Sequence, residues 1–81
     1  MQCEILLFAD VADLIGQRRM VIELAEGSRV ADAVHHLARE HPSFNGWRDR
    51  VTCAVNERYA RADSLIEDGD VIAIIPPVSG G

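Results

Sequence analysis

The chain ends on the stretch PPVSGG, residues 76–81, whose residue types in this order could do chemistry. The two prolines fix φ at about −65° and cannot donate a hydrogen bond to a neighbouring strand, which predicts a stiff exit from the strand before them. The two glycines lack a Cβ, so they can enter a channel too narrow for other residues. The pattern predicts a tail that presents its terminal carboxylate to a distant site.

The carboxylate of Gly81 must be activated before it can react. A C-terminal carboxyl group has a pKa of about 3.3–3.7, so at neutral pH it is ionised and a poor electrophile. Adenylation by ATP would convert it to an acyl-adenylate, from which sulfide or an amine could displace AMP. The alternative interpretation is a frayed end of small residues without a role, as at many chain termini.

Length, composition and charge exclude several classes of function. The 81 residues, 48% hydrophobic and 26% charged, are typical of one small folded domain. A net charge of −5 argues against nucleic-acid binding, because phosphate backbones require a clustered basic surface. No apolar run approaches the roughly 20 residues that span a bilayer, and the N-terminus lacks the pattern of a signal peptide. We expect a cytoplasmic protein with no nucleic-acid or membrane partner.

The titratable residues before the tail form no catalytic or metal-binding pattern. His35 and His36 are adjacent on a predicted helix and point about 100° apart, with no third ligand at a suitable spacing. The stretch EDGD at 67–70 lacks the twelve-residue ligand pattern of a calcium loop. Cys3 and Cys53 lie inside apolar runs, which predicts buried thiols. We therefore expect no bound metal or cofactor.

Alternating and continuous apolar runs predict four strands and a further short edge strand near Tyr59. The first two strands are expected to form an antiparallel hairpin joined through Gly16. The last strand should end at the prolines. The expected strands cover residues 3–11, 16–27, 51–56 and 71–77.

One main helix is predicted between the hairpin and the later strands. The apolar spacing over 30–41 indicates one buried helical face, with Ser28 as N-cap and Pro42 as terminator. A helix across one face of a mixed sheet of four to five strands is the β-grasp arrangement, an α+β fold. We assign residues 1–77 to this domain and 78–81 to a flexible C-terminal tail.

The alternation of side chains predicts an apolar surface on this domain. The first and last strands, ILLF at 5–8 and VIAII at 71–75, should lie side by side and parallel at the centre, and both are apolar on both faces. One helix covers one face, so the other face would be left open. An open apolar face is typical of a protein that binds a partner. We expect Phe44 and Trp47 to fold back onto the core and Leu65 and Ile66 to plug it. The alternative is that Trp47, Phe44 or a loop covers the open face.

The sequence resembles the small, sulfur-carrier subunit of molybdopterin synthase, a family of ubiquitin-like β-grasp proteins. The resemblance extends over essentially the whole chain, through LLFADVADLIG, EGSRVADAVHHLAREHP, TCAVN and LIEDGDVIAIIPPVSGG. The ending is the specific part, because related carriers of the thiazole pathway usually lack a PPV(S/T)GG terminus.

The resemblance implies a route for sulfur through Gly81. An adenylating enzyme similar to ubiquitin E1 uses ATP to activate Gly81, a sulfur-donor protein converts the adenylate to a thiocarboxylate, and the tail inserts into the large synthase subunit. There the sulfur passes to a cyclic pterin monophosphate, building the dithiolene of molybdopterin. Catalytic residues are expected on the large subunit, so this chain would be the carrier subunit of a sulfurtransferase of two small and two large subunits.

The resemblance also implies which residues act. Gly81 is the reacting terminus, preceded by Gly80. Family members contact partners through the open sheet face and the tail, at positions that match Phe8, Tyr59, Ile75, Pro76, Pro77, Val78 and Ser79. One departure is Ala12-Asp13 where many relatives have Arg-Glu, which leaves any partner contact of that arginine in doubt here.

Two other functions also fit the residues. The first is a carrier for another pathway, such as thiazole synthesis or tRNA thiolation, or a ubiquitin-like modifier attached to lysines. The second is a β-grasp interaction module whose tail has no reaction to perform.

Overall fold

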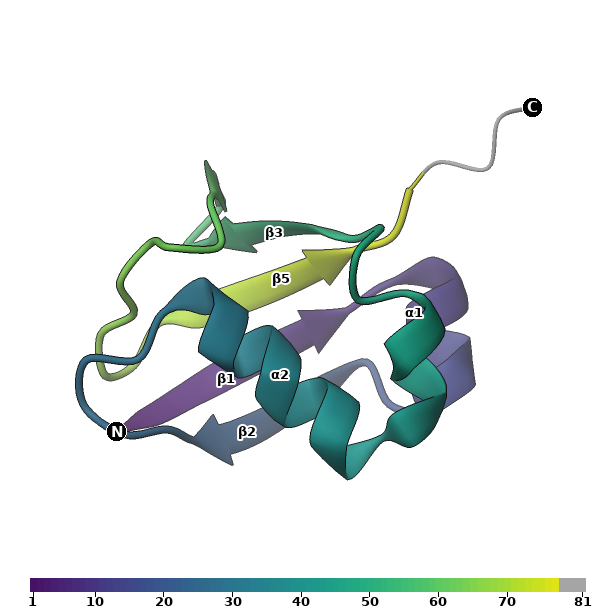
Figure 1. Ribbon diagram of the computed structural model, residues 1–81, viewed down its shortest axis with the longest axis horizontal. Coiled ribbons are helices and arrows are strands. Elements are labelled where there is room, and N and C mark those ends of the chain that lie inside the picture. The colour runs from purple at the N-terminus through teal and green to yellow at the C-terminus, as the bar shows by residue number, and fades with distance from the viewer. Residues whose placement is uncertain (78–81) are drawn as a thin grey trace.

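The computed structural model describes residues 1–77 and shows a five-stranded mixed sheet with its main helix across one face and a shorter helix at one end (Figure 1). This confirms the predicted β-grasp fold, while the predicted tail, 78–81, lies outside the described residues. The strand order across the sheet is β2-β1-β5-β3-β4. In chain order the elements are β1 (Gln2–Leu7), α1 (Ala9–Ile15), β2 (Arg19–Glu23), α2 (Val30–Glu40), the 3₁₀-helix η1 (Pro42–Gly46), β3 (Thr52–Val55), β4 (Arg58–Ala60) and β5 (Val71–Ile75).

The two most apolar strands form the parallel centre of the sheet, as predicted. β1 and β5 run side by side, with Ile5 opposite Ile72 and Leu7 opposite Ile74. β2 pairs antiparallel with β1, and β3 pairs antiparallel with β5. β5 therefore carries the chain from the middle of the sheet directly to Pro76.

A second helix, α1, was not predicted and replaces the end of the expected first strand. β1 stops at Leu7, and α1 follows with Phe8 as its N-cap residue. Gly16, at φ 84°, ends the helix, and its N–H donates to the carbonyl oxygen of Ala12 at 2.8 Å. β1 and β2 are antiparallel as expected, but a helix rather than a tight turn connects them.

The helix α2 begins later than expected, with Arg29 rather than Ser28 at the N-cap position. The carboxylate of Asp32 accepts a hydrogen bond from the Arg29 N–H at 2.7 Å. The loop after β4 satisfies the next two N–H groups, because Val30 and Ala31 donate to carbonyl oxygens of that loop at 2.9 Å each. The N-terminus of α2 is thus capped by a segment more than thirty residues away in the sequence.

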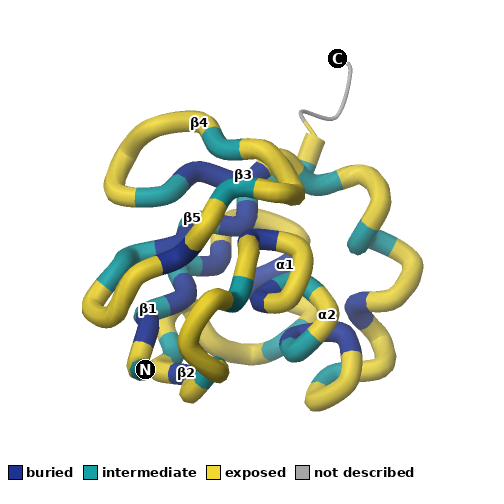
Figure 2. Tube along the Cα trace, turned by 60° about the vertical axis from the view of Figure 1, so that its left-hand side comes forward, coloured by how far each residue is buried: buried dark blue, intermediate teal, exposed yellow. Residues whose placement is uncertain are grey.

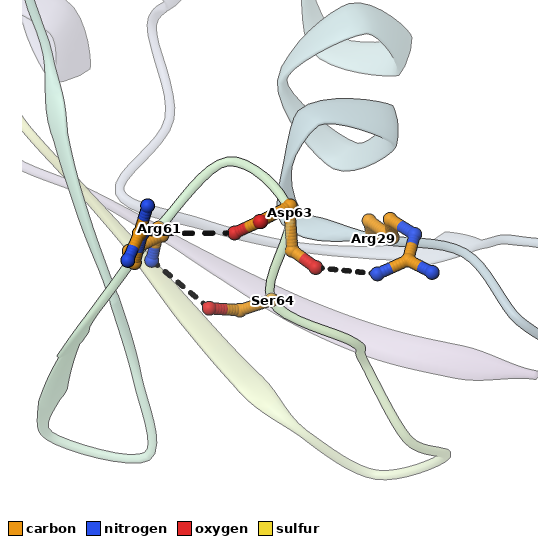
Figure 3. A network of polar contacts seen from close by, with 4 residues as sticks. All are labelled: Arg29, Arg61, Asp63 and Ser64. Atoms are coloured by element: carbon orange, nitrogen blue, oxygen red, sulfur yellow. Dashed lines mark hydrogen bonds and ion pairs between the residues drawn. The ribbon is translucent and has the colours of Figure 1, made fainter.

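Polar contacts from Arg29 and within the loop hold this loop in place (Figure 3). Arg29 Nη1 donates to the carbonyl oxygen of Asp63 at 2.6 Å, and the Arg61 N–H donates to Ser64 Oγ at 3.0 Å. The ion pair of Arg61 and Asp63, 3.8 Å apart, is exposed and contributes little by itself. Because β4 has only three residues, the hydrogen bonds of this loop to Arg29, Val30 and Ala31 at the start of α2 help to hold this edge of the sheet.

The hydrophobic core lies between the sheet and the helices (Figure 2). Phe44 is fully buried in it and Trp47 packs against it, so the alternative in which these aromatic residues cover the open face is wrong. Ile66 is buried, but Leu65 is 60% exposed, so only Ile66 plugs the core. Both cysteines are buried, as predicted.

We expect the substitution Phe44→Ala to lower the free energy of unfolding by about 3–5 kcal/mol, because it empties a fully buried aromatic site. Tyr59→Ala is the matched control. Its side chain is 81% exposed, so the change should stay within about 0.5 kcal/mol. Urea unfolding followed by circular dichroism measures both. Equal losses for the two variants would contradict this division between core and surface.

Candidate functional site

The face of the sheet that no helix covers carries a row of apolar side chains across four strands. Leu6 of β1 lies opposite Ala73 of β5, and Ala73 lies opposite Ala54 of β3. Ala54 in turn lies opposite Tyr59 of β4. Two small side chains therefore occupy the middle of the row, and larger ones stand at its ends. This size pattern leaves a hollow in the open face.

The hollow consists of two adjoining cavities of about 490 and 450 Å³ that share Phe8, Glu57 and Ala73. We call it the open-face groove. Phe8 is 45% exposed and Tyr59 81% exposed, which is unusual for aromatic side chains on a small domain. The groove is lined by Leu6, Phe8, Ala54, Asn56, Glu57, Tyr59, Val71, Ala73 and Ile75.

The lining of the groove suits binding rather than catalysis. Of the described residues that line it, Glu57 alone is charged. Apolar walls gain free energy by burying the apolar side chains of a partner, at about 25 cal/mol per Å². A basic group on the partner could meet the carboxylate of Glu57 at the rim. The arrangement can therefore hold an apolar protein surface in a defined orientation.

The rim of the groove is fixed by the two-residue turn between β3 and β4. Val55 pairs with Arg58, and the two residues between them, Asn56 and Glu57, have φ of 50° and 70°, as a type I′ turn requires. The Asn56 side chain donates to Asp70 Oδ1 at 2.9 Å and accepts from the Val71 N–H at 3.0 Å. The turn is thereby tied to the start of β5.

The structure brings together three of the five predicted site residues that lie within residues 1–77. Phe8, Tyr59 and Ile75 line one cavity although they come from three separate parts of the chain. Pro76 is half-buried next to Ile75, and Pro77 is exposed. The remaining predicted residues, Val78, Ser79, Gly80 and Gly81, lie outside the described part of the chain.

Sequence reasoning missed Ala54, Asn56 and Glu57 as lining residues. Ala54 could have been found from strand alternation, since its neighbour Cys53 faces the core. Glu57 had a weaker signal, because a turn that needs positive φ at both central residues usually has Asn-Gly rather than Asn-Glu.

The thiols do not behave as reactive groups. Burial raises the pKa of Cys53, and burial together with the nearby charges of Asp70 and Asp68 raises the pKa of Cys3. Both therefore stay protonated at neutral pH, where the thiolate is the nucleophilic form. Neither cysteine lines the open-face groove.

Residues 1–77 contain neither a cluster of metal ligands nor a membrane-spanning helix. No group of three or more His, Cys, Asp or Glu side chains in this range could hold a metal ion. Neither of its α-helices is long and apolar enough to cross a membrane.

Comparison with known proteins gives the family. The family model described as "ThiS family" matches residues 5–81. The chain belongs to the ThiS family. The molybdopterin synthase sulfur carrier subunit of Chlamydomonas reinhardtii is 32% identical over 83 residues, covering 100% of both chains.

Solved structures of similar proteins share the fold of this ThiS-family chain. The crystal structure of small archaeal modifier protein 1 from Haloferax volcanii superimposes with a TM-score of 0.90 at 29% identity, covering 100% of both chains. A complex of subunits 1 and 2 of the molybdopterin-converting factor from Helicobacter pylori contains a chain with a TM-score of 0.71 at 23% identity, covering 100% of both chains. The likeness to the second shows the fold alone.

We expect Glu57→Gly to raise the free energy of unfolding by up to about 1 kcal/mol, because glycine removes the cost of a left-handed conformation at φ 70°. Asn56→Gly is the control in the same turn. It should destabilise the protein, since it loses the hydrogen bonds to Asp70 and Val71. Urea unfolding distinguishes the two, and a loss of stability for Glu57→Gly would show that this turn is not strained.

Proposed function

We propose that this chain is a sulfur carrier whose Gly81 carboxyl group is converted to a thiocarboxylate and serves molybdopterin synthase. The observation that carries the proposal is the family match over residues 5–81, which includes the PPVSGG terminus. The relative in Chlamydomonas reinhardtii named as a molybdopterin synthase sulfur carrier subunit, similar over its full length, supports the choice of pathway.

The chemistry at Gly81 takes two steps, which are activation of the carboxylate by ATP and displacement of AMP by sulfide. The carboxylate attacks the α-phosphorus of ATP on an adenylating enzyme, which releases pyrophosphate and leaves an acyl-adenylate. Sulfide delivered by a sulfur-donor protein then attacks the carbonyl carbon, a C–S bond forms and AMP leaves. The thiocarboxylate sulfur next bonds to a cyclic pterin monophosphate in the large subunit, where we expect the catalytic residues. Water then cleaves the C–S bond at Gly81, which leaves the sulfur on the pterin and restores the carboxylate. The carrier itself needs no bound cofactor.

The open-face groove would position the tail for both partners. β5 lines the groove with Ile75 and leads at once into Pro76, so a protein docked on Phe8, Tyr59 and Ile75 lies where the tail begins. Since the adenylating enzyme and the large subunit would use the same groove, they would bind one at a time. The carrier would therefore leave the adenylating enzyme before it binds the large subunit. In the assembled synthase, two carriers would bind two large subunits.

A protein modifier is the second candidate function. The similarity to small archaeal modifier protein 1, over the whole of both chains, favours it. In that case an amine of a target protein, rather than sulfide, would displace AMP from the same acyl-adenylate. The two functions share the activation step and differ in the nucleophile that follows.

Incubation with ATP, the adenylating enzyme and a sulfur donor should raise the intact mass by about 16 Da, because sulfur replaces one oxygen. A variant with an alanine added after Gly81 should show no gain, since its carboxylate no longer follows the two glycines. The double variant Cys3→Ala, Cys53→Ala is the control and should still gain the mass. A gain of about 16 Da that is lost with the cysteines would instead indicate oxidation of a thiol to a sulfenic acid, and a gain of about 32 Da would indicate a persulfide. An extended variant that reacts unprocessed would refute the proposal.

The same mass experiment with a cell extract separates the alternatives. All eight basic residues of this chain are arginine, so an isopeptide to a lysine in an adduct must lie on the other protein. Such adducts would favour the modifier. Full function after deletion of Gly80 and Gly81 would favour a plain interaction module.

We expect Phe8→Glu and Ile75→Glu to weaken binding to the large synthase subunit by about tenfold or more, because a carboxylate would be buried in an apolar contact. Their stability should change less, as both side chains face the groove rather than the core. Titration calorimetry measures the binding and urea unfolding the stability. Val21→Glu, on the same face but outside the groove, is the matched control. Variants that unfold would show that Phe8 and Ile75 belong to the core.

A further inference from the structure

Within residues 1–77, no strand lies beside the outer edge of β2, on the side of the sheet opposite to β4. Met1 and Leu24 exchange two hydrogen bonds, at 2.8 and 2.9 Å, and Leu7 donates to the Arg18 carbonyl oxygen at 2.9 Å. In an antiparallel ladder the bonded pairs alternate, so Arg18, Met20, Ile22 and Leu24 turn their backbone groups toward β1. The N–H and C=O groups of Arg19, Val21 and Glu23 therefore point outward from the sheet.

The side chains of these three residues are exposed on the face that carries the open-face groove. Val21 is 63% exposed, a high value for a valine within a strand. Arg19 and Glu23 flank it with opposite charges, and Arg19 Nε lies 3.3 Å from Glu4 Oε1 on the neighbouring strand. At the other edge, β4 has three residues and continues into the loop that caps α2. β2 is thus the longer and the less covered of the two edge strands.

The sequence Arg19-Met20-Val21-Ile22-Glu23 is complementary to itself when a second copy runs antiparallel. With Val21 opposite Val21 of the copy, Arg19 falls opposite Glu23 and Glu23 opposite Arg19. These three pairs join the residues whose backbone groups point outward, so about six inter-chain hydrogen bonds become available. Opposite charges directly across a ladder stabilise it, and like charges destabilise it. Met20 would lie opposite Ile22 on the helix-covered face.

We propose that two copies of this chain associate through β2 in this register, about a two-fold axis at Val21, to form one continuous ten-stranded sheet. Charged residues on an edge strand normally deter pairing with unrelated strands. Here the order of charges selects a second copy, because any other register or a parallel strand loses the two Arg-Glu pairs. The contact involves few residues, so the dimer is weak and reversible.

The dimer leaves the proposed carrier chemistry free. The open-face groove is formed by β1, β5, β3 and β4, and Pro76 follows β5, whereas the contact uses only the far edge of β2. The proposal therefore does not rest on the proposed function.

Sedimentation equilibrium of the full chain from about 10 µM to about 1 mM tests the proposal. We expect a monomer–dimer equilibrium in this range for the natural sequence. Arg19→Glu and Glu23→Arg should each weaken it by about tenfold or more, since each puts like charges opposite one another twice. The double variant R19E/E23R restores opposite charges and should regain the dimer, and an equimolar mixture of the two single variants should form a heterodimer.

Val21→Pro provides a second test that does not depend on charge. Its N–H faces outward, so proline removes an inter-chain donor without breaking the ladder to β1. The dimer should be lost while the thermal unfolding midpoint of the monomer is largely kept. A natural chain that stays monomeric at about 1 mM would overturn the proposal. A dimer that withstands the charge variants and Val21→Pro would also overturn it, because another surface would then form the contact.

Discussion

Helices cover only one face of the sheet, and the rest of the structure depends on this constraint. The domain has two α-helices and a 3₁₀-helix: α2 lies across one face of the sheet, and α1 packs beside η1 at the end where β1 stops (Figure 1). β1 and β5 nevertheless carry apolar residues on both faces, because they form the centre of the sheet. One apolar set builds the core around Phe44, and the other lies open on the uncovered face. Folding thus uses one set, and the partner binding proposed above would use the other.

Side-chain size turns the open face into a groove with a direction. Ala54 and Ala73 are small at the centre, whereas Phe8, Tyr59 and Ile75 rise around them. The Asn56-Glu57 turn is bound to the start of β5, and the groove ends where β5 passes into Pro76. A protein seated in the groove is therefore held in a fixed relation to the beginning of the tail, which is what delivery of a terminal group requires.

The sequence predicts much of this arrangement because its strongest patterns are local. Continuous apolar strands, the spacing from Val30 to Ala38 and the prolines gave the sheet, α2 and the end of β5 correctly. The sequence patterns did not predict α1, because seven residues give too few turns to show a helical period. Gly16 also ends a helix as readily as it joins a hairpin. The start of α2 depends on carbonyl groups of a loop distant in sequence, and the burial of Ile66 rather than Leu65 depends on how that loop packs. Such tertiary effects leave no periodic signal.

Methyl NMR of the carrier titrated with the large subunit of molybdopterin synthase tests whether the open-face groove is the surface that the partner recognises. We expect shifts for the methyl signals of Leu6, Ala54, Ala73 and Ile75, with little change for Ala31, which is exposed on α2. Shifts confined to Ala31 and its neighbours, with the groove signals unmoved, would contradict this expectation.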